Sequence, residues 1–349
     1  MILIAFFILI LANIWLKKKT KYNLYPFIIV ALILYSGLRY NYGFDFNNYL
    51  IHFHEIGAIS DVIKTNYEKG YSLLVFVFKI LGFGFNTFLL FIAFFSIKMK
   101  EKVFNKLSVL PDVSLLLYFL LFYIVNDVEQ IRHGISIGFC FYSIVFLCEN
   151  DKKSKIISFI LIVLGILFHI SAVLFIPIFF VKDKILNKKI YVGIFIISIF
   201  LSFINYFELL KIINDSLLHS KYLSLKINSY STEYQSFLSL TLLIKCFILS
   251  VFSFYAFNDQ NKLHRLLFNI YYIGIIYTIL FSNIPILMAR GTTYMRYAEL
   301  LMIPIYMKAT KNQDNRKLHL MITTLIFGYY IFKFITIVIQ PEYFNYTSI

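Results

Sequence analysis

The chain has 349 residues, of which 60% are hydrophobic and 15% charged, and its formal net charge at pH 7 is +15. Its apolar residues form long runs from end to end, which indicates an integral membrane protein and leaves no stretch for a separate soluble domain. In a soluble protein this positive charge would suggest nucleic-acid binding. Here the lysines cluster between apolar segments, as they do on the cytoplasmic side of membrane proteins, so we expect no nucleic-acid partner.

The first apolar segment, 1–16, has no basic residue before it and no small-residue cleavage site, and lysines follow it directly. We therefore expect a retained first transmembrane helix rather than a cleaved signal. Counting these lysines, six lysine-rich segments along the chain hold 21 of the 33 Lys and Arg residues, and we place them in the cytoplasm. They are 17–21, 98–106, 149–155, 182–189, 258–265 and 308–317.

That placement predicts an all-α, polytopic protein with about 12 transmembrane helices, since a helix of roughly 20 apolar residues crosses the hydrocarbon layer. The whole chain, 1–349, then forms a single transmembrane domain. Segment 71–97 is interrupted by "GFGFN", which leaves open a short re-entrant piece followed by a full span. The short segments 156–168 and 169–181 are also compatible with a tight helical hairpin.

With those six segments inside, five connections reach the outer face: 39–70, 126–134, 168–171, 207–236 and 284–297. They carry four of the six arginines, Arg39, Arg132, Arg290 and Arg296, against the positive-inside trend. Arginine grips phosphate or carboxylate with a planar fork of donors and keeps its charge near a membrane. We expect an anion-binding surface here. The alternative is that each arginine reaches lipid head groups or pairs with a neighbouring acid.

The first outer connection also combines an acid with aromatic residues. Asp45 and Tyr49 are four residues apart and share a face if this stretch is helical, and Gly43 permits a sharp entry to that helix. Aromatic rings beside a carboxylate are typical of sugar sites, so Tyr40, Tyr42 and Tyr49 are candidate sugar contacts. An interfacial aromatic belt is the simpler explanation for each tyrosine taken singly.

Two further residues are candidates for chemistry. His169 lies between two apolar runs and has a side chain suited to act as a base, although a lone histidine is often structural. Glu68 begins a predicted helix, where the helix dipole alone favours an acid. The "HFHE" stretch does not converge on a metal ion, the three cysteines predict neither disulfide nor zinc, and no nucleotide or hydrolase motif appears. We expect no metal and no cofactor.

Five motifs follow one another along the chain over about residues 25–310: "LRYNYGFDFNNYLIHF", "YEKGYSLL", "NDVEQIRHGISIGFCFYSIVFL", "LFHISAVLFIPIFF" and "RGTTYMRYAELLMIPIY". In this order they resemble the EpsG-like branch of the Wzy-type bacterial polysaccharide polymerases. The resemblance implies an O-antigen, capsule or exopolysaccharide polymerase with a membrane glycosyltransferase fold of the GT-C kind. Such an enzyme works without a metal and sits in the bacterial inner (cytoplasmic) membrane, with its active site facing the periplasm or the exterior.

The implied reaction transfers a growing glycan from undecaprenyl diphosphate to the non-reducing end of a fresh lipid-linked oligosaccharide repeat unit. The resemblance assigns the diphosphate first to Arg132, then to Arg39, Arg290 and Arg296. Asp45 and His169 are both candidates for the base, and the choice between them stays open. Sugar contacts are expected from Tyr40, Tyr42, Tyr49 and Tyr294, with Glu68 as a further substrate-binding candidate. Membrane lipid and a chain-length regulator protein are the other expected partners.

Three other functions share parts of this pattern. A flippase or exporter of lipid-linked oligosaccharide would also need cations for the diphosphate, but deep within several spans rather than at one face. An O-antigen ligase uses the same donor and passes the glycan to lipid A core. A membrane acyltransferase would use His169 as its base and leaves the outer arginines unexplained.

Overall fold

The computed structural model describes residues 2–149, 151–181, 185–204, 240–258, 261–310, 315–340 and 347–348. These residues are almost wholly helical, which confirms the all-α prediction, and their two strands are two residues each. The chain divides into two compact units: Met1–Val173 with Ile303–Ile349, and Leu174–Met302. The organisation of 1–349 as one transmembrane domain stays a prediction.

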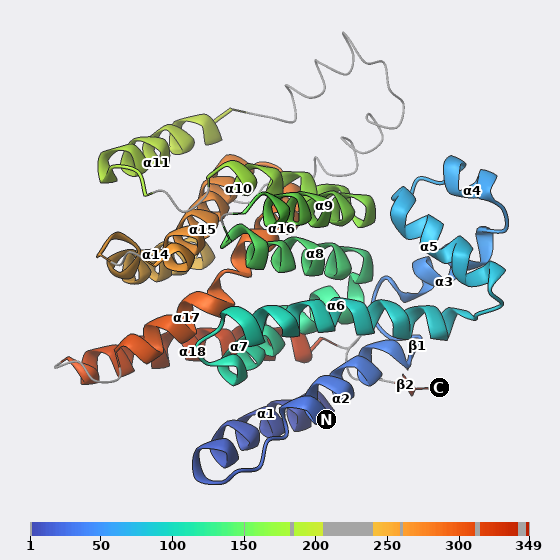
Figure 1. The fold of residues 1–349 in the computed structure, drawn as a ribbon, viewed down its shortest axis with the longest axis horizontal. Helices are drawn as coiled ribbons and strands as arrows, with labels where there is room; N and C mark the ends of the chain where they lie inside the picture. The colour runs from blue at the N-terminus through green and yellow to red at the C-terminus, as the bar shows by residue number, and fades with distance from the viewer. Residues whose placement is uncertain are drawn as a thin grey trace. The chain divides into compact units, whose positions relative to one another are not determined.

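Most of the described helices belong to the first unit, and they are labelled in Figure 1. In chain order they are α1 (Ile2–Lys19), α2 (Tyr25–Gly37), α3 (Phe46–Glu55), α4 (Ile59–Lys64), α5 (Lys69–Ile80), α6 (Phe85–Leu107), α7 (Pro111–Tyr118), the π-helix η1 (Phe119–Glu129), α8 (Ile131–Leu147), α9 (Lys152–Phe168) and α18 (Arg316–Val338). Strands β1 (Arg39–Tyr40) and β2 (Thr347–Ser348) pair antiparallel. Helix α8 packs against both α6 and α9, and α2 packs against α6.

The second unit is built around α15 (Lys262–Leu280), which packs against α10 (Ile176–Val181), α11 (Lys188–Ser202), α14 (Leu240–Asn258) and α16 (Pro285–Arg296). The 3-10 helix η2 (Ile170–Phe175) and helix α17 (Glu299–Ala309) run across the two boundaries between the units. The predicted outer connection 207–236 lies outside the described residues.

Local sequence explains where several helices begin and end. Pro111 at the start of α7 needs no hydrogen-bond partner for its nitrogen, and Asp112 in the same turn complements the helix dipole. Asp151 caps α9 by accepting a hydrogen bond from the Ser154 amide at 2.8 Å. Gly82 has a φ of +77° and interrupts the segment predicted at 71–97. The segment therefore forms two separate helices, α5 and α6.

Three helical stretches in the described residues are long and apolar enough to cross a membrane: Pro111–Glu129, Lys262–Leu280 and Arg316–Val338. Shorter apolar helices include Tyr25–Gly37 and Ile131–Leu147. The count of about 12 crossings therefore stays a prediction. Segment 98–106, expected as a cytoplasmic loop, is instead helical as the end of α6, and Lys100 within it is buried with an acidic partner. Its side of the membrane stays a prediction. Residues 126–134 and 284–297 are likewise mostly helical, and their side of the membrane remains a prediction.

Candidate active site

Arg132 lies in the first turn of α8 and is enclosed by three tyrosines. Its guanidinium carbon is 4.4 Å from the ring centre of Tyr67, 5.7 Å from that of Tyr49 and 5.8 Å from that of Tyr71. Aromatic faces attract a cation at these distances. The guanidinium also forms an ion pair with Glu68, and 21% of the Arg132 side chain remains exposed. The cage therefore holds Arg132 in place and leaves part of it accessible.

Glu68 connects this cage to the segment after α9. It lies just before α5, and its second carboxylate oxygen accepts a hydrogen bond from the Ile170 amide at 3.4 Å. Helices α5 and α9 approach each other closely here because Gly70 on α5 has no side chain. A Cβ atom at that position would lie 2.7 Å from the carbonyl oxygen of Leu167 on α9. The carboxylate thus brings His169, the neighbour of Ile170, to the same region as Arg132.

Asp45 and Tyr49 reach the site from α3, as the spacing predicted. The Tyr49 hydroxyl lies 3.4 Å from a carboxylate oxygen of Asp45 and can donate to it. Gly43 precedes them with a φ of +91°, and the Phe44 amide donates to the Glu129 carboxylate at 3.4 Å. Glycine at 43 both adopts the left-handed turn and leaves room for Glu129, whose Cγ would lie 3.3 Å from a Cβ atom there.

Two histidines lie side by side behind the cage. The ring centres of His133 and His169 are 4.8 Å apart, and both residues are buried. Nδ1 of His169 is 2.6 Å from the Ser171 hydroxyl, and Nδ1 of His133 is 3.2 Å from the Gln130 side-chain oxygen. His133 directly follows Arg132 on α8, so its side chain points in a direction about 100° from that of Arg132. The structure shows that this direction leads to His169.

The remaining candidates of the first outer connection lie in different surroundings. Arg39 is only 1% exposed, and its guanidinium donates to the carbonyl oxygen of Ser36. Tyr42 is also buried and receives a hydrogen bond from the Tyr35 hydroxyl at 3.1 Å. Tyr40 is exposed, with its ring edge-on to Phe46. Arg39 and Tyr42 therefore support the interior of this unit, whereas Tyr40 lies at its surface.

Arg290, Tyr294 and Arg296 all lie on α16, in the second unit. Arg296 donates to the Glu299 carboxylate at 3.3 Å, and the Tyr271 hydroxyl donates to the same oxygen at 2.8 Å. Tyr294 is buried with its ring near Phe175. The structure thus brings these residues together on one helix, and a site shared with Arg132 stays a prediction.

Tyr67, Tyr71 and His52 also belong to the site, and the sequence alone did not predict them there. The ring of His52 stacks on Tyr67 at 3.9 Å between centres and on Tyr71 at 5.7 Å, and its Nε2 is 3.0 Å from the Ser72 hydroxyl. A signal was present, because Tyr67 and Tyr71 flank Glu68 in the "YEKGY" stretch. His52 was considered only as a metal ligand. Among the described residues no group of three or more His, Cys, Asp or Glu could hold a metal ion.

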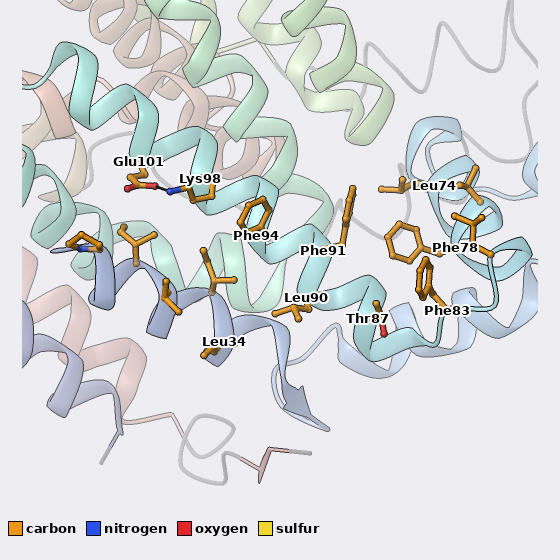
Figure 2. Close-up of a pocket in the computed structure, with 16 residues that line it drawn as sticks. Leu34, Leu74, Phe78, Phe83, Thr87, Leu90, Phe91, Phe94, Lys98 and Glu101 are labelled. Carbon is orange, nitrogen blue, oxygen red and sulfur yellow. Dashed lines mark ion pairs between the residues drawn. The ribbon is translucent and has the colours of Figure 1, made fainter. Parts of the chain in front are cut away.

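An apolar groove of about 890 Å³ lies between α2, α5 and α6 (Figure 2). Leu34, Phe78 and Phe91 are among its lining side chains, and Lys98 and Glu101 form an ion pair at one end. The helix that begins at the cage, α5, also supplies Leu74 and Val77 to this groove. Such a wall suits a hydrocarbon chain.

The state of His52 depends on pH. Burial, and secondarily the positive charge of Arg132, lower the pKa of His52 to about 4. The folded protein therefore holds this ring neutral, whereas the unfolded chain takes up a proton below about pH 6.5. The resulting stability is fully present above pH 6.5 and is lost as the pH falls toward 4.

We expect the purified protein in detergent to unfold at a lower temperature at pH 5 than at pH 7, with His52 responsible for part of the change. Allowing for screening by water, this part is on the order of 1 kcal/mol, or about 2–4 °C in Tm. His52→Gln keeps a polar side chain and cannot titrate, so its Tm should depend less on pH. An equal pH dependence in both proteins would show that His52 does not carry the effect.

Together these observations define an all-α membrane protein with a caged arginine, two carboxylates and a pair of histidines in one unit. The chain belongs to the EpsG family, whose model matches residues 22–348, and the resemblance drawn from the motifs is confirmed. Over 196 residues it is 29% identical to the amylovoran biosynthesis protein AmsC of Erwinia amylovora. That match covers 52% of this chain and 51% of the relative, so the chain spans about half the length of the curated relative. No solved structure matches the chain.

Proposed function

We propose that this protein is a polysaccharide polymerase of the bacterial inner membrane. It transfers a growing glycan from undecaprenyl diphosphate to the non-reducing end of a lipid-linked oligosaccharide repeat unit, on the periplasmic or exterior face. Membership of the EpsG family supports this proposal, as does the similarity to a protein named for amylovoran biosynthesis. We further propose a GT-C-like arrangement, catalysis without a metal and a chain-length regulator protein as a partner.

The observation that carries the proposal is a set of buried polar atoms around Arg132. Nε of Arg132, the Tyr71 hydroxyl and Nδ1 of His52 have no hydrogen-bond partner among the described residues. Buried polar groups are nearly always paired, so such a cluster favours a site completed by a ligand. Its donors suit oxygens of a diphosphate or a sugar, and the apolar groove on α5 suits the lipid that carries them.

In the proposed reaction an acceptor hydroxyl attacks the anomeric carbon of the donor glycan. The new glycosidic bond forms as the bond between that carbon and the diphosphate oxygen breaks, and the diphosphate leaves with the electron pair. Positive charge fixed beside the departing diphosphate stabilises this transition state, which is the role proposed for Arg132. The hydroxyl proton passes to Asp45 or His169. Tyr49 orients Asp45, and Ser171 orients His169.

The function is tested in a strain that lacks the gene. Deletion should leave single repeat units on the surface, and the wild-type gene should restore long chains. If deletion instead removes surface glycan while polymer accumulates on its lipid carrier, the protein is a ligase. If single lipid-linked units accumulate on the inner side, it is an exporter.

The two base candidates are expected to differ in their substitutions. Asp45→Asn and His169→Gln both keep a hydrogen-bonding side chain of similar size, but only the variant that removes the base should lower chain elongation by about 10² or more. The variant at the other position should keep an intermediate rate, because it still orients substrate. Chain length at matched protein level measures this. Near wild-type chains in both variants would exclude both residues as the base.

A further inference from the structure

A buried ion pair ties α6 to the residues on either side of Arg132. Lys100 on α6 and Asp127 on η1 are both 0% exposed, with Nζ of Lys100 at 2.6 Å and 2.8 Å from the two carboxylate oxygens. The same ammonium group donates to the Ser96 hydroxyl at 2.8 Å. The Tyr118 hydroxyl donates to Asp127 at 2.6 Å. The pair is therefore closely coordinated from α6 and from the end of α7.

The network reaches the backbone of α8 directly. Nζ of Lys100 donates to the carbonyl oxygen of Gly134 at 3.0 Å. The Gly134 amide in turn donates to the carbonyl oxygen of Gln130 at 2.7 Å. Gln130 is the single residue between η1 and α8, with φ −91° and ψ 63°. Because one ammonium group binds residues on both sides of Gln130, it fixes the angle at which α8 leaves η1. Arg132 and His133 lie between the two anchored points, Asp127 and Gly134.

Stability alone is a weak reason for such a pair. Removing two charges from water costs several kcal/mol per ion, and well-packed apolar replacements of a buried pair are often neutral or stabilising. A fully bonded network does hold its members in one geometry. The π-helix that carries Asp127 is also a local irregularity of the kind found at functional sites.

On the basis of the proposed function, we propose that Lys100 and Asp127 are positioning residues for glycan transfer. They hold the start of α8 so that Arg132 faces Glu68 and the tyrosine cage while His133 faces His169. The pair touches no substrate and acts through the backbone at Gly134. Its loss should therefore lower the rate of the chemical step more than the affinity for substrate.

The test compares purified wild type with Lys100→Met/Asp127→Leu, using the lipid-linked repeat unit extracted from the deletion strain. The double variant removes both charges and keeps apolar volume, so it should unfold within a few degrees of wild type. We expect kcat to fall about tenfold to a hundredfold, because small misplacement of a catalytic group has effects of this size, while KM changes less than about twofold. Lys17→Met removes the more exposed Lys17 and Asp112 pair and should keep wild-type kcat.

Tyr118→Phe provides a variant without a change in charge. It removes one hydrogen bond to Asp127, should fold like wild type, and is expected to lower kcat about threefold or more. A purely structural role predicts instead that the folded protein keeps wild-type kcat in every variant and that only Tm or yield falls. Wild-type kcat in the variants that fold, Tyr118→Phe included, overturns the proposal.

Failure of this inference can be told from failure of the proposed function. If wild type does not elongate the extracted repeat unit, the proposed function is wrong, and the positioning role that rests on it is wrong as well. If wild type elongates it and the pair variants do so equally well, polymerisation stands and the positioning role is wrong.

Discussion

Arg132→Lys should abolish long-chain polysaccharide in cells, with single or very short units remaining at the surface. Lysine keeps a positive charge but offers no planar fork, so it cannot bind Glu68 and a diphosphate oxygen together in the geometry of the guanidinium group. Losing a donor aimed at developing charge costs about 10²–10³ in rate, and we expect a loss of at least that size. The length distribution of surface glycan at matched protein level measures it.

The matched control is Arg316→Lys, since Arg316 is exposed at the start of α18 and should give wild-type chains. A double variant separates binding of substrate from the ion pair. If Arg132 served only to neutralise Glu68, Arg132→Lys/Glu68→Gln would be no worse than the more harmful single change. The proposed role would be contradicted by long chains from Arg132→Lys itself. It would also be contradicted by a double variant that is no worse than the more harmful single change.

Gly134→Ala should lose most of its folded protein. A Cβ atom at this position would lie 2.1 Å from the carbonyl oxygen of Asn126, and backbone there cannot withdraw as a flexible side chain would. The start of α8 would have to move away from the end of η1, and the hydrogen bond from Lys100 to Gly134 would be strained with it. We expect a loss of about 3 kcal/mol or more in stability, measured as yield and Tm in detergent.

Gly328→Ala is the control for this change. Gly328 lies inside α18, and a Cβ atom there meets nothing within 4 Å. Alanine favours a helix interior over glycine, so this variant should be unchanged or more stable by up to about 1 kcal/mol. A Gly134→Ala protein with the yield and Tm of wild type would show that the turn between η1 and α8 adapts without cost.

Hydropathy and residue identity were enough to predict an all-α membrane protein. Apolar runs are local features, and a helix satisfies its own backbone hydrogen bonds within the run, so no distant contact is needed to recognise it. The same applies to Asp45 and Tyr49, whose spacing of four residues placed them on one helix face, and to the break at Gly82 within 71–97. The order of motifs identified the family, which the family comparison confirmed.

Local sequence pattern was less informative about whether a charged side chain is exposed to water or buried beside a partner. A lysine-rich stretch at 98–106 predicted a cytoplasmic loop, since charge avoids hydrocarbon. The structure continues α6 through it and buries Lys100 against Asp127. A buried partner removes the penalty that the prediction relied on, and that partner is 27 residues away in the chain.

The sequence by itself determined the helical class of this protein, its membrane character, its family and the chemical groups available to a site. Only the tertiary structure decided which of those groups meet. Arg132 is 64 residues from Glu68 in the chain, and His133 meets His169 across a different helix pair. Such meetings depend on how closely helices approach, which glycines such as Gly70 and Gly134 permit. Approach distance is a property of two surfaces at once, so no single stretch of sequence contains it.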